Sequence, residues 1–253
     1  MIKAVISGAT GKMGRKVHSV ISTRRDIMTI AGIDALTQKS YDTFPIVKEP
    51  GLLTEKPDVI IDFSHPLMLD SILGYCLTTN TPLVAATTGY TSEQTAKIKK
   101  AAEIIPLFFS FNMSLGINLL VNLSQKAAEV LGMDFDIEII EKHHNLKIDS
   151  PSGTAIMLAD TLNEARGGNM QNVYDRYAKR KKRADNEIGI SAVRGGTIVG
   201  EHEVMFCGRD EIITLSHGAY SKEVFAVGAV NAAIFIADKP AGLYDMTKLI
   251  EAR

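Results

Sequence analysis

Two histidines and a lysine, His143, His144 and Lys147, occur within five residues of one another. The residues before them alternate between apolar and acidic side chains, which is typical of a strand with one buried face. A helical pattern follows, and Ser152 stands where a helix N-cap is expected. The segment therefore predicts a proton donor and cations at a strand end, close to a helix N-terminus whose backbone N–H groups can hold an anion.

Each of these features also has a purely structural interpretation. Adjacent histidines at a strand end are often surface residues, and Ser-Gly-Thr is an ordinary helix cap. Their combination in one short segment favours an active site. A metal site is not favoured, because the chain has six His and two Cys and neighbouring strand residues point to opposite faces of a sheet.

The composition bounds the class of protein. The chain has 253 residues, of which 45% are hydrophobic and 23% charged, as expected for one large or two smaller globular domains. A net charge of −1 predicts no general attraction to nucleic acid or to an acidic membrane. Two cysteines, no signal-peptide pattern and no long apolar run together predict a cytoplasmic protein without membrane association.

The N-terminus has the pattern of a dinucleotide-binding unit. An apolar strand is predicted over 2–7, and Gly8, Gly11 and Gly14 follow it before a helical pattern begins. Glycines in this context permit a tight turn, close approach of a pyrophosphate, and close packing of helix on sheet. Asp34 ends a second predicted strand, 20 residues after Gly14, where an acidic residue normally binds the adenosine ribose. A turn residue is the alternative interpretation of Asp34.

Predicted strands and helices alternate up to residue 113, which favours an α/β fold with a Rossmann-like, doubly wound parallel sheet. Ligands of such sheets bind beyond the carboxyl ends of the strands. The residues predicted at those ends are Gly8, Ala9, Thr10, Gly11, Lys12, Met13, Asp34, Phe63, Ser64, His65, Ala86, Thr87, Thr88, Ser110, Phe111, Asn112 and Met113.

The pattern changes after Ser114. A long amphipathic helix is predicted over 115–131, then the histidine-bearing strand, a helix over 153–166, and strands over 187–193, 197–206 and 211–217. Short Gly-containing turns between the last three strands predict antiparallel hairpins. The sequence thus predicts a dinucleotide-binding domain over 1–113, completed by helices within 223–253. A second, α+β domain with a mixed, largely antiparallel sheet is predicted over 114–222.

Residues 141–155, EKHHNLKIDSPSGTA, resemble the signature E-x-H-H-x-x-K-x-D-x-P-S-G-T-A of the 4-hydroxy-tetrahydrodipicolinate reductase (dihydrodipicolinate reductase) family of bacterial lysine, or diaminopimelate, biosynthesis. The glycine-rich start, Ala86-Thr87-Thr88-Gly89, Arg194-Gly195-Gly196 and Val199-Gly200-Glu201-His202 match as well. The resemblance covers nearly the whole chain.

The resemblance implies an NAD(P)H-dependent oxidoreductase that reduces 4-hydroxy-tetrahydrodipicolinate, a small dicarboxylate, to tetrahydrodipicolinate. It implies His143 as catalytic acid/base and Lys147 as proton donor, with His144, Gly153 and Thr154 binding substrate. The strand-end residues given above, other than Phe63, Ser64 and His65, would bind the nicotinamide dinucleotide. Members of the family are homotetramers joined through the sheet of the second domain.

Two positions bear on cofactor choice. Ala35 follows Asp34 and His65 follows Ser64, where some relatives carry arginines that would meet the 2′-phosphate of NADPH. Lys12, Arg15 and Lys16 lie near enough in sequence to offset part of this loss. We therefore expect NADH to be preferred and NADPH to be used.

Two alternatives remain at this point. Another two-domain nicotinamide dehydrogenase, such as an aspartate dehydrogenase, would share the first domain but would not need the His-His-x-x-Lys and Ser-Gly-Thr combination. A nucleic-acid-binding protein is suggested by six basic residues among the eight of 176–183. A solvated loop is the simpler interpretation of that stretch, because the chain is nearly neutral and shows no aromatic stacking platform.

Overall fold

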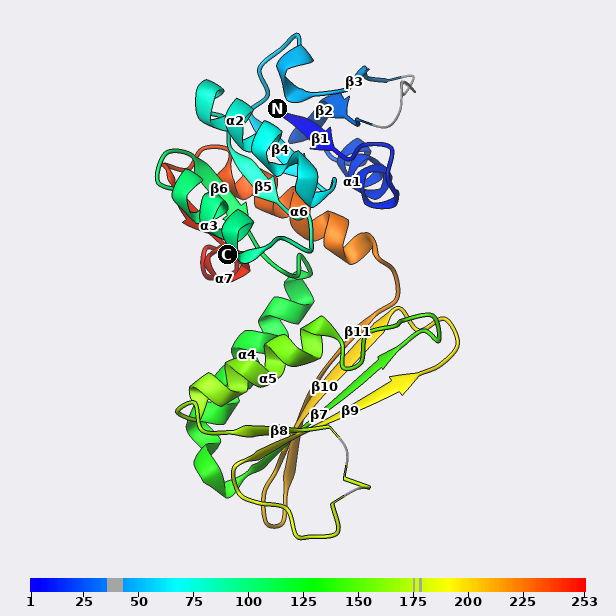
Figure 1. The fold of residues 1–253 in the computed structure, drawn as a ribbon, viewed down its shortest axis with the longest axis vertical. Coiled ribbons are helices and arrows are strands. Elements are labelled where there is room, and N and C mark those ends of the chain that lie inside the picture. Colours follow the sequence, from blue (N-terminus) through cyan, green and yellow to red (C-terminus); the bar gives the residue numbers. More distant parts are fainter. Residues whose placement is uncertain (36–42, 175, 178) are drawn as a thin grey trace. The chain divides into compact units, whose positions relative to one another are not determined.

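The computed structural model describes residues 1–35, 43–174, 176–177 and 179–253. The chain divides into two compact units, one formed by residues 1–115 with 223–253 and the other by residues 116–222 (Figure 1). Each unit contains its own sheet.

Unit 1 is built on a seven-stranded sheet in which every neighbouring pair is parallel. The strand order is β12-β6-β5-β4-β1-β2-β3, so the chain winds outward in both directions from β1. The strands are β1 (Ile2–Ser7), β2 (Ile27–Ile33), β3 (Ile46–Val47), β4 (Val59–Asp62), β5 (Leu83–Ala85), β6 (Pro106–Phe109) and β12 (Gly242–Tyr244).

Helices cover both faces of this sheet, as a doubly wound fold requires. One apolar cluster joins the sheet to α1 (Lys12–Ser22), α6 (Glu223–Ile236) and α7 (Met246–Glu251). A second cluster joins the opposite face to α2 (Leu69–Thr79) and α3 (Ser92–Ala101). Short 3₁₀ helices lie at η1 (Pro50–Leu52) and η2 (Pro66–Met68). The predicted Rossmann-like sheet is confirmed.

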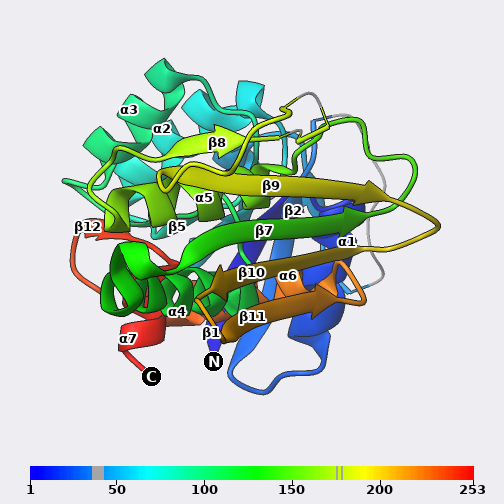
Figure 2. The same cartoon turned by 90° about the horizontal axis from the view of Figure 1, so that it is seen from below.

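Unit 2 has a mixed five-stranded sheet in the order β11-β10-β7-β9-β8, which can be followed in Figure 2. The strands are β7 (Asp136–His143), β8 (Gln171–Val173), β9 (Glu187–Arg194), β10 (Gly200–Cys207) and β11 (Ile212–Ala219). One face packs against α4 (Leu115–Leu131) and α5 (Gly153–Ala165) through a single apolar cluster. A 3₁₀ turn, η3 (Gly132–Asp134), joins α4 to β7. The mixed sheet is confirmed.

One predicted hairpin is wrong. The sequence suggested that β9 turns directly into an antiparallel β10, but β7 lies between them, parallel to β9 and antiparallel to β10. The hairpin between β10 and β11 is as predicted. The Gly195-Gly196 turn therefore carries the chain across β7, and this places residues of both β9 and β10 beside the end of β7.

Three short strands escaped prediction, because two or three residues are too few to show periodicity. β3 lies within 36–56, which was interpreted as a connection, and residues 36–42 of that segment lie outside the described residues. β8 and β12 fall in stretches for which the sequence predicted no strand. Among the residues that the structure describes, no helix is long and apolar enough to cross a membrane.

Candidate active site

The glycine-rich loop of unit 1 has the geometry that a pyrophosphate needs. Gly8 has φ +75°, and a Cβ there would lie 2.5 Å from the carbonyl oxygen of Phe63. A Cβ on Gly14 would lie 2.2 Å from the carbonyl oxygen of Gly8. Gly11 is exposed and caps α1 without a side-chain hydrogen bond. The residues of this loop therefore fit a dinucleotide at an open helix N-terminus.

Asp34 lies directly beside this loop. Its Oδ2 accepts hydrogen bonds from the backbone N–H of Thr10, at 3.1 Å, and from the Thr10 hydroxyl. The guanidinium Nε of Arg15 donates to the carbonyl oxygen of Thr10 at 2.8 Å. A carboxylate and a cation are thus both held at the edge of the glycine-rich loop.

The residues that follow β5 and β6 lie at the carboxyl ends of strands parallel to β4 and β1. Ala86, Thr87 and Met113 are buried, whereas Thr88 and Phe111 are exposed. The Ser110 hydroxyl donates to the carbonyl oxygen of Asn112 at 2.9 Å, which fixes that turn. The structure therefore places all the predicted strand-end residues on the carboxyl-terminal side of one sheet.

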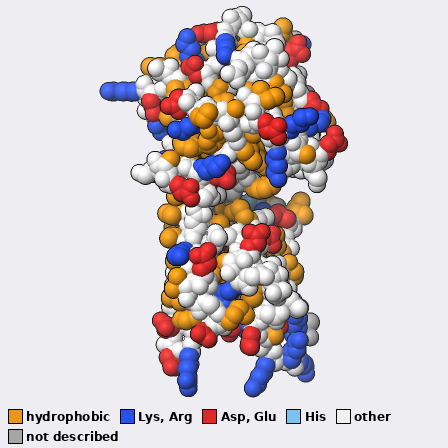
Figure 3. All heavy atoms as spheres, turned by 90° about the vertical axis from the view of Figure 1, so that its left-hand side faces the viewer, with side chains coloured by type: hydrophobic (Ala, Val, Ile, Leu, Met, Phe, Trp, Pro, Cys, Tyr) orange, Lys and Arg blue, Asp and Glu red, His pale blue; other side chains and the backbone are white. Residues whose placement is uncertain are grey.

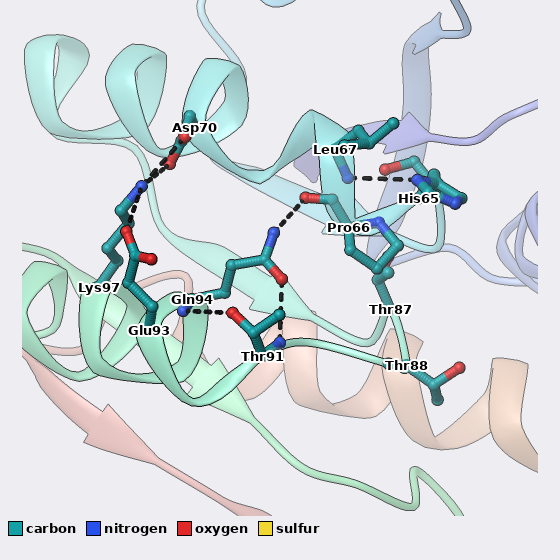
Figure 4. A pocket seen from close by; sticks show the side chains of 12 residues that line it. His65, Pro66, Leu67, Asp70, Thr87, Thr88, Thr91, Glu93, Gln94 and Lys97 are labelled. Carbon is teal, nitrogen blue, oxygen red and sulfur yellow. Dashed lines mark hydrogen bonds and ion pairs between the residues drawn. The ribbon is translucent and has the colours of Figure 1, made fainter.

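A cavity of about 750 Å³ opens beside two of these strand ends (Figure 4). His65, Thr87 and Thr88 line it, together with residues at the start of α2 and α3. His65 Nδ1 accepts from the backbone N–H of Leu67 at 3.2 Å, so one ring nitrogen serves to cap η2. Lys97 Nζ forms an ion pair with Asp70 Oδ1 at 2.9 Å.

A buried carboxylate, Asp62, lies at the end of β4 next to that cavity. It is 1% exposed and accepts hydrogen bonds from the hydroxyls of Ser64, Thr87 and Tyr90 at 2.6, 2.9 and 3.1 Å, and from the Ser64 backbone N–H at 3.1 Å. Burial and the charge of Asp62 raise the pKa of the Tyr90 phenol, so that this hydroxyl stays protonated. The cluster joins the loops that follow β4 and β5.

In unit 2, His143 is the last residue of β7, and its imidazole is buried against Glu141. His143 Nδ1 lies 2.6 Å from Glu141 Oε2. The Arg194 guanidinium donates to both Glu141 oxygens, at 2.8 and 2.7 Å, and the Ser152 backbone N–H donates to Oε1 at 2.9 Å. Burial alone would raise the pKa of the Glu141 carboxyl, but these hydrogen bonds outweigh burial and hold it below its ordinary value.

A second buried imidazole, His202 on β10, faces His143 edge to face, with 5.2 Å between ring centroids. His202 Nε2 lies 3.0 Å from the Ser152 hydroxyl, which also accepts from the backbone N–H of Ala155 at 3.1 Å. Ser152 is therefore the N-cap of α5, as predicted. Burial, with a smaller contribution from His143, lowers the pKa of His202 to about 4.

The loop between β7 and α5 carries the remaining predicted residues. Lys147 Nζ lies 2.8 Å from Asp149 Oδ1, and this bond lowers the pKa of the Asp149 carboxyl. His144 is half-buried, and Gly153 and Thr154 form the first turn of α5. The structure thus gathers all five predicted residues of this segment within unit 2, around the end of β7 and the start of α5.

Sequence reasoning assigned no role to Glu141, Arg194 or His202. Glu141 and His202 lie inside segments that were already singled out, and Arg194 was interpreted as a turn residue. The available signal was Glu141 itself, because it continues the buried, apolar row of Ile137 and Ile139 with a carboxylate.

The basic stretch is partly engaged within unit 2. Arg176 pairs with Glu187 at 2.5 Å, and Arg183 pairs with Asp136 at 2.6 Å and Glu138 at 3.2 Å. Acidic and basic side chains are mixed over the visible face of the molecule (Figure 3). Within the described ranges, no group of three or more His, Cys, Asp or Glu side chains could hold a metal ion.

Comparison with known proteins identifies the family. Residues 2–113 match the family model described as dihydrodipicolinate reductase, N-terminus, and residues 116–250 match the one described as dihydrodipicolinate reductase, C-terminus. The chain belongs to the dihydrodipicolinate reductase family. It is accordingly a nicotinamide-dependent oxidoreductase.

Relatives of this reductase family align over nearly the whole chain. The 4-hydroxy-tetrahydrodipicolinate reductase of Caldanaerobacter subterraneus subsp. tengcongensis is 45% identical over 99% of both chains. The reductase of that name from Exiguobacterium sibiricum is 49% identical over 94% of this chain and 93% of its own.

Among solved structures, a dipicolinate-bound dihydrodipicolinate reductase from Paenisporosarcina sp. TG-14 has a TM-score of 0.79 at 27% identity, over 97% of both chains. An aspartate dehydrogenase from Thermotoga maritima has a TM-score of 0.51 at 11% identity, over 95% of this chain and 98% of its own. The latter shows a shared fold alone, so the aspartate dehydrogenase alternative is not favoured over the reductase family.

Proposed function

We propose that the chain reduces 4-hydroxy-tetrahydrodipicolinate to tetrahydrodipicolinate with a nicotinamide cofactor, as a step of lysine (diaminopimelate) biosynthesis. The observation that carries the proposal is the site at the end of β7, where His143, Lys147 and the start of α5 occur in one unit of a chain that aligns end to end with reductases of that name.

The cofactor, when bound, supplies a hydride. The 4-hydroxyl of the substrate leaves as water together with a proton from the adjacent ring carbon, which creates a carbon–carbon double bond conjugated with the ring imine. Hydride addition at C4 then leaves negative charge on the conjugated atoms, which a cation stabilises and one proton neutralises. We assign His143 as the acid/base that moves the proton during the loss of water, because its imidazole is oriented by a buried carboxylate. We assign Lys147 to stabilisation of the charge and donation of the proton, since its ammonium is held on the same loop by Asp149.

The substrate is a dicarboxylate, and three residues are proposed to bind it. Gly153 and Thr154 belong to the first turn of α5, whose backbone N–H groups and positive dipole end favour a carboxylate. The Thr154 hydroxyl and the His144 imidazole, which lies on the preceding loop, are proposed to add side-chain donors. If this placement is right, Thr154→Val and His144→Ala each weaken the binding of pyridine-2,6-dicarboxylate about tenfold. Unchanged calorimetric affinity in both variants contradicts the placement.

The dinucleotide is assigned to the strand ends of unit 1. Gly8, Ala9, Thr10, Gly11, Lys12 and Met13 would hold the pyrophosphate, Asp34 the adenosine ribose, and Ala86, Thr87, Thr88, Ser110, Phe111, Asn112 and Met113 the nicotinamide side. NADH is proposed as the preferred cofactor and NADPH as an accepted one, because the Asp34 carboxylate opposes a 2′-phosphate while Arg15 lies at the same loop.

A homotetramer is proposed through the sheet of unit 2. The face of this sheet opposite α4 and α5 carries half-exposed residues on β10, and on the same face β11 exposes the apolar side chain of Ile212, which lies opposite Cys207. Light scattering on the purified chain tests the assignment. Replacing Ile212 by glutamate is expected to lower the measured mass, and a monomeric wild type contradicts the proposal.

Steady-state kinetics tests the activity. We expect NADH oxidation, followed by absorbance, when the chain is mixed with freshly generated 4-hydroxy-tetrahydrodipicolinate. Oxaloacetate with ammonia serves as the matched control for an aspartate dehydrogenase. Turnover of the control mixture without turnover of the dipicolinate precursor overturns the proposal.

A further inference from the structure

The row of side chains on the buried face of β7 changes character near its end. Residues two apart on a strand share a face, so Ile137, Ile139, Glu141 and His143 form one row. The first two are core residues, and the third is a carboxylate with no exposed surface. Burying a carboxylate costs free energy unless charged or hydrogen-bonding groups compensate it. The groups around Glu141 therefore determine how its charge is stabilised and how the carboxylate is oriented.

Four donors occupy the two oxygens of Glu141. Oε1 accepts from the Ser152 N–H at 2.9 Å and from one nitrogen of Arg194 at 2.7 Å. Oε2 accepts from the other terminal nitrogen of Arg194 at 2.8 Å and contacts His143 Nδ1 at 2.6 Å. Arg194 also donates to the carbonyl oxygens of Val193 and Asp149, at 2.8 and 2.7 Å. The two-point bond fixes the carboxylate in one orientation.

This arrangement determines which nitrogen of His143 carries the proton. An ionised carboxylate has no hydrogen to donate, so Nδ1 must be the donor to Oε2. Nε2 is then the ring atom available to exchange a proton with a ligand. The structure leaves room on that side, because Gly200 of β10 lies next to the ring and a Cβ there would come within 3.1 Å of Nε2.

We propose that Glu141, oriented by Arg194, is the positioning residue of His143, which holds the imidazole with its Nδ1 protonated and presents Nε2 to the substrate. The inference rests on the proposed function for the statement that His143 is the acid. The assignment of the His143 tautomer is independent of the proposed function, because it follows from the contacts within unit 2 alone. Glu141 acts through His143 and touches no reacting atom.

Glu141→Gln is the test, because it keeps the size of the side chain and removes the charge. The remaining amide oxygen is expected to stay with Arg194, which can only donate, so the amide NH₂ faces Nδ1 and the ring changes to the Nε2–H tautomer. We expect kcat to fall by at least about 100-fold, as carboxylate-to-amide changes behind a catalytic histidine do, with substrate and cofactor KM within about threefold.

Glu201→Gln is the matched control. Glu201 lies on the neighbouring strand and pairs with Lys142 at 3.0 Å, with about two fifths of each side chain exposed. The same chemical change there removes an ion pair of the same sheet without touching His143. We expect kcat of this variant within about twofold of wild type, since exposed pairs contribute little. Equal kcat values for the Glu141 and Glu201 variants overturn the proposal.

Nitrogen-15 NMR of histidine-labelled protein reports which ring nitrogen of His143 carries the proton. A purely structural role of Glu141 would leave this protonation site unchanged. The His143 signals, assigned with His143→Gln, should show Nδ1–H in wild type and Nε2–H in Glu141→Gln, both at a pH where the ring is neutral. Retention of Nδ1–H in the variant overturns the proposal. This measurement needs no substrate, so a wild type without reductase turnover refutes the proposed function and leaves the positioning test intact.

Arg194→Lys keeps the test available if Glu141→Gln does not fold. Lysine preserves the charge beside Glu141 but cannot form the two-point bond. We expect His143 to keep Nδ1–H and kcat to fall by about tenfold, because the carboxylate is less firmly oriented. Wild-type kcat in a folded Arg194→Lys protein overturns the role given to the arginine.

Discussion

Two buried carboxylates, Asp62 in unit 1 and Glu141 in unit 2, are stabilised by different hydrogen-bonding partners. Both lie near the carboxyl end of a strand, and both are at most 1% exposed. The Asp62 carboxylate accepts hydrogen bonds from hydroxyls and from one backbone N–H. The partners of Glu141 are a guanidinium, an imidazole and one backbone N–H.

The difference lies in what the partners can do. A hydroxyl can turn and either donate or accept, whereas a guanidinium can only donate. The cluster at Asp62 therefore tolerates a change of charge, and it serves to join the loops that line the cavity. The cluster at Glu141 permits one arrangement of protons. The contrast agrees with the roles proposed for the two units: cofactor binding in unit 1 requires fixed loops, and proton transfer at His143 in unit 2 requires a fixed protonation state.

The largest expected effect is on the chemistry proposed for unit 2. His143→Gln and Lys147→Ala should each lower kcat by at least about 100-fold, the usual scale for loss of an acid or of a stabilising cation. The dissociation constant for NADH should change by less than about twofold, because neither residue belongs to the strand ends of unit 1. Near-normal turnover in both variants would contradict the catalytic role proposed for His143 and Lys147 in unit 2.

The second effect concerns the pH dependence of stability in unit 2. The pKa of His202 falls from an ordinary 6.5 to about 4 in the folded chain. The unfolded chain therefore binds more protons between these values, and the unfolding free energy falls as the pH drops through that window. We expect His202 to account for a loss of about 2 kcal/mol between about pH 7 and pH 5.

Urea unfolding of wild type and His202→Gln at the two pH values measures this contribution. The variant should lose correspondingly less stability on acidification, because glutamine does not titrate. Other groups contribute equally to both proteins, so the difference isolates His202. The same pH dependence in both proteins would show that this imidazole is not kept neutral by burial.

Local patterns in the sequence predicted much of this molecule. The bounds of β1, β2 and α4 follow from apolar periodicity and from Gly132 at the end of α4. The Ser152 cap and the position of His143 at a strand end also follow from neighbouring residues. The insertion of β7 between β9 and β10 could not be predicted in this way, because it depends on pairing between residues far apart in the chain.

The same limit explains the residues that were missed. Arg194 reaches Glu141 only because β9 pairs with β7, with His143 opposite Arg194 in the register. His202 meets Ser152 only because β10 pairs with the other edge of β7, with Glu141 opposite His202. The sequence predicts which residues can transfer a proton, and the sheet order decides which residues orient them.

The third prediction tests the unit 1 side of the comparison. Asp34→Ala should lower kcat/KM for NADH about tenfold, because two hydrogen bonds to the ribose are lost. With NADPH the same value should stay equal or rise, since a carboxylate opposite a phosphate dianion is removed. Measurement of kcat/KM for NADH and for NADPH, in wild type and in Asp34→Ala, tests whether Asp34 sets the cofactor preference. A wild type that favours NADPH tenfold or more would show that the basic residues near the loop outweigh Asp34.

The smallest effect is predicted for Asp62→Asn, the counterpart of Glu141→Gln. The amide oxygen can take the place of Oδ1 and keep both bonds from Ser64, whose backbone N–H can only donate. The amide NH₂ then occupies the place of Oδ2 and faces the hydroxyls of Thr87 and Tyr90. Both hydroxyls can turn to accept, and Thr87 has the carbonyl oxygen of Asp62 within 3.4 Å to receive its proton.

The amide and the Thr87 hydroxyl thus find partners after the substitution, whereas the proton of the half-buried Tyr90 hydroxyl loses its carboxylate acceptor. We expect the unfolding free energy to fall by about 1 kcal/mol, the usual scale for one lost hydrogen bond, and kcat and the KM for NADH to stay within about threefold of wild type. Urea unfolding and steady-state kinetics beside Glu141→Gln measure the contrast. A loss of kcat as large as that of the Glu141 variant would mean that Asp62 also requires its charge, and the two carboxylates would then have to be assigned the same kind of role.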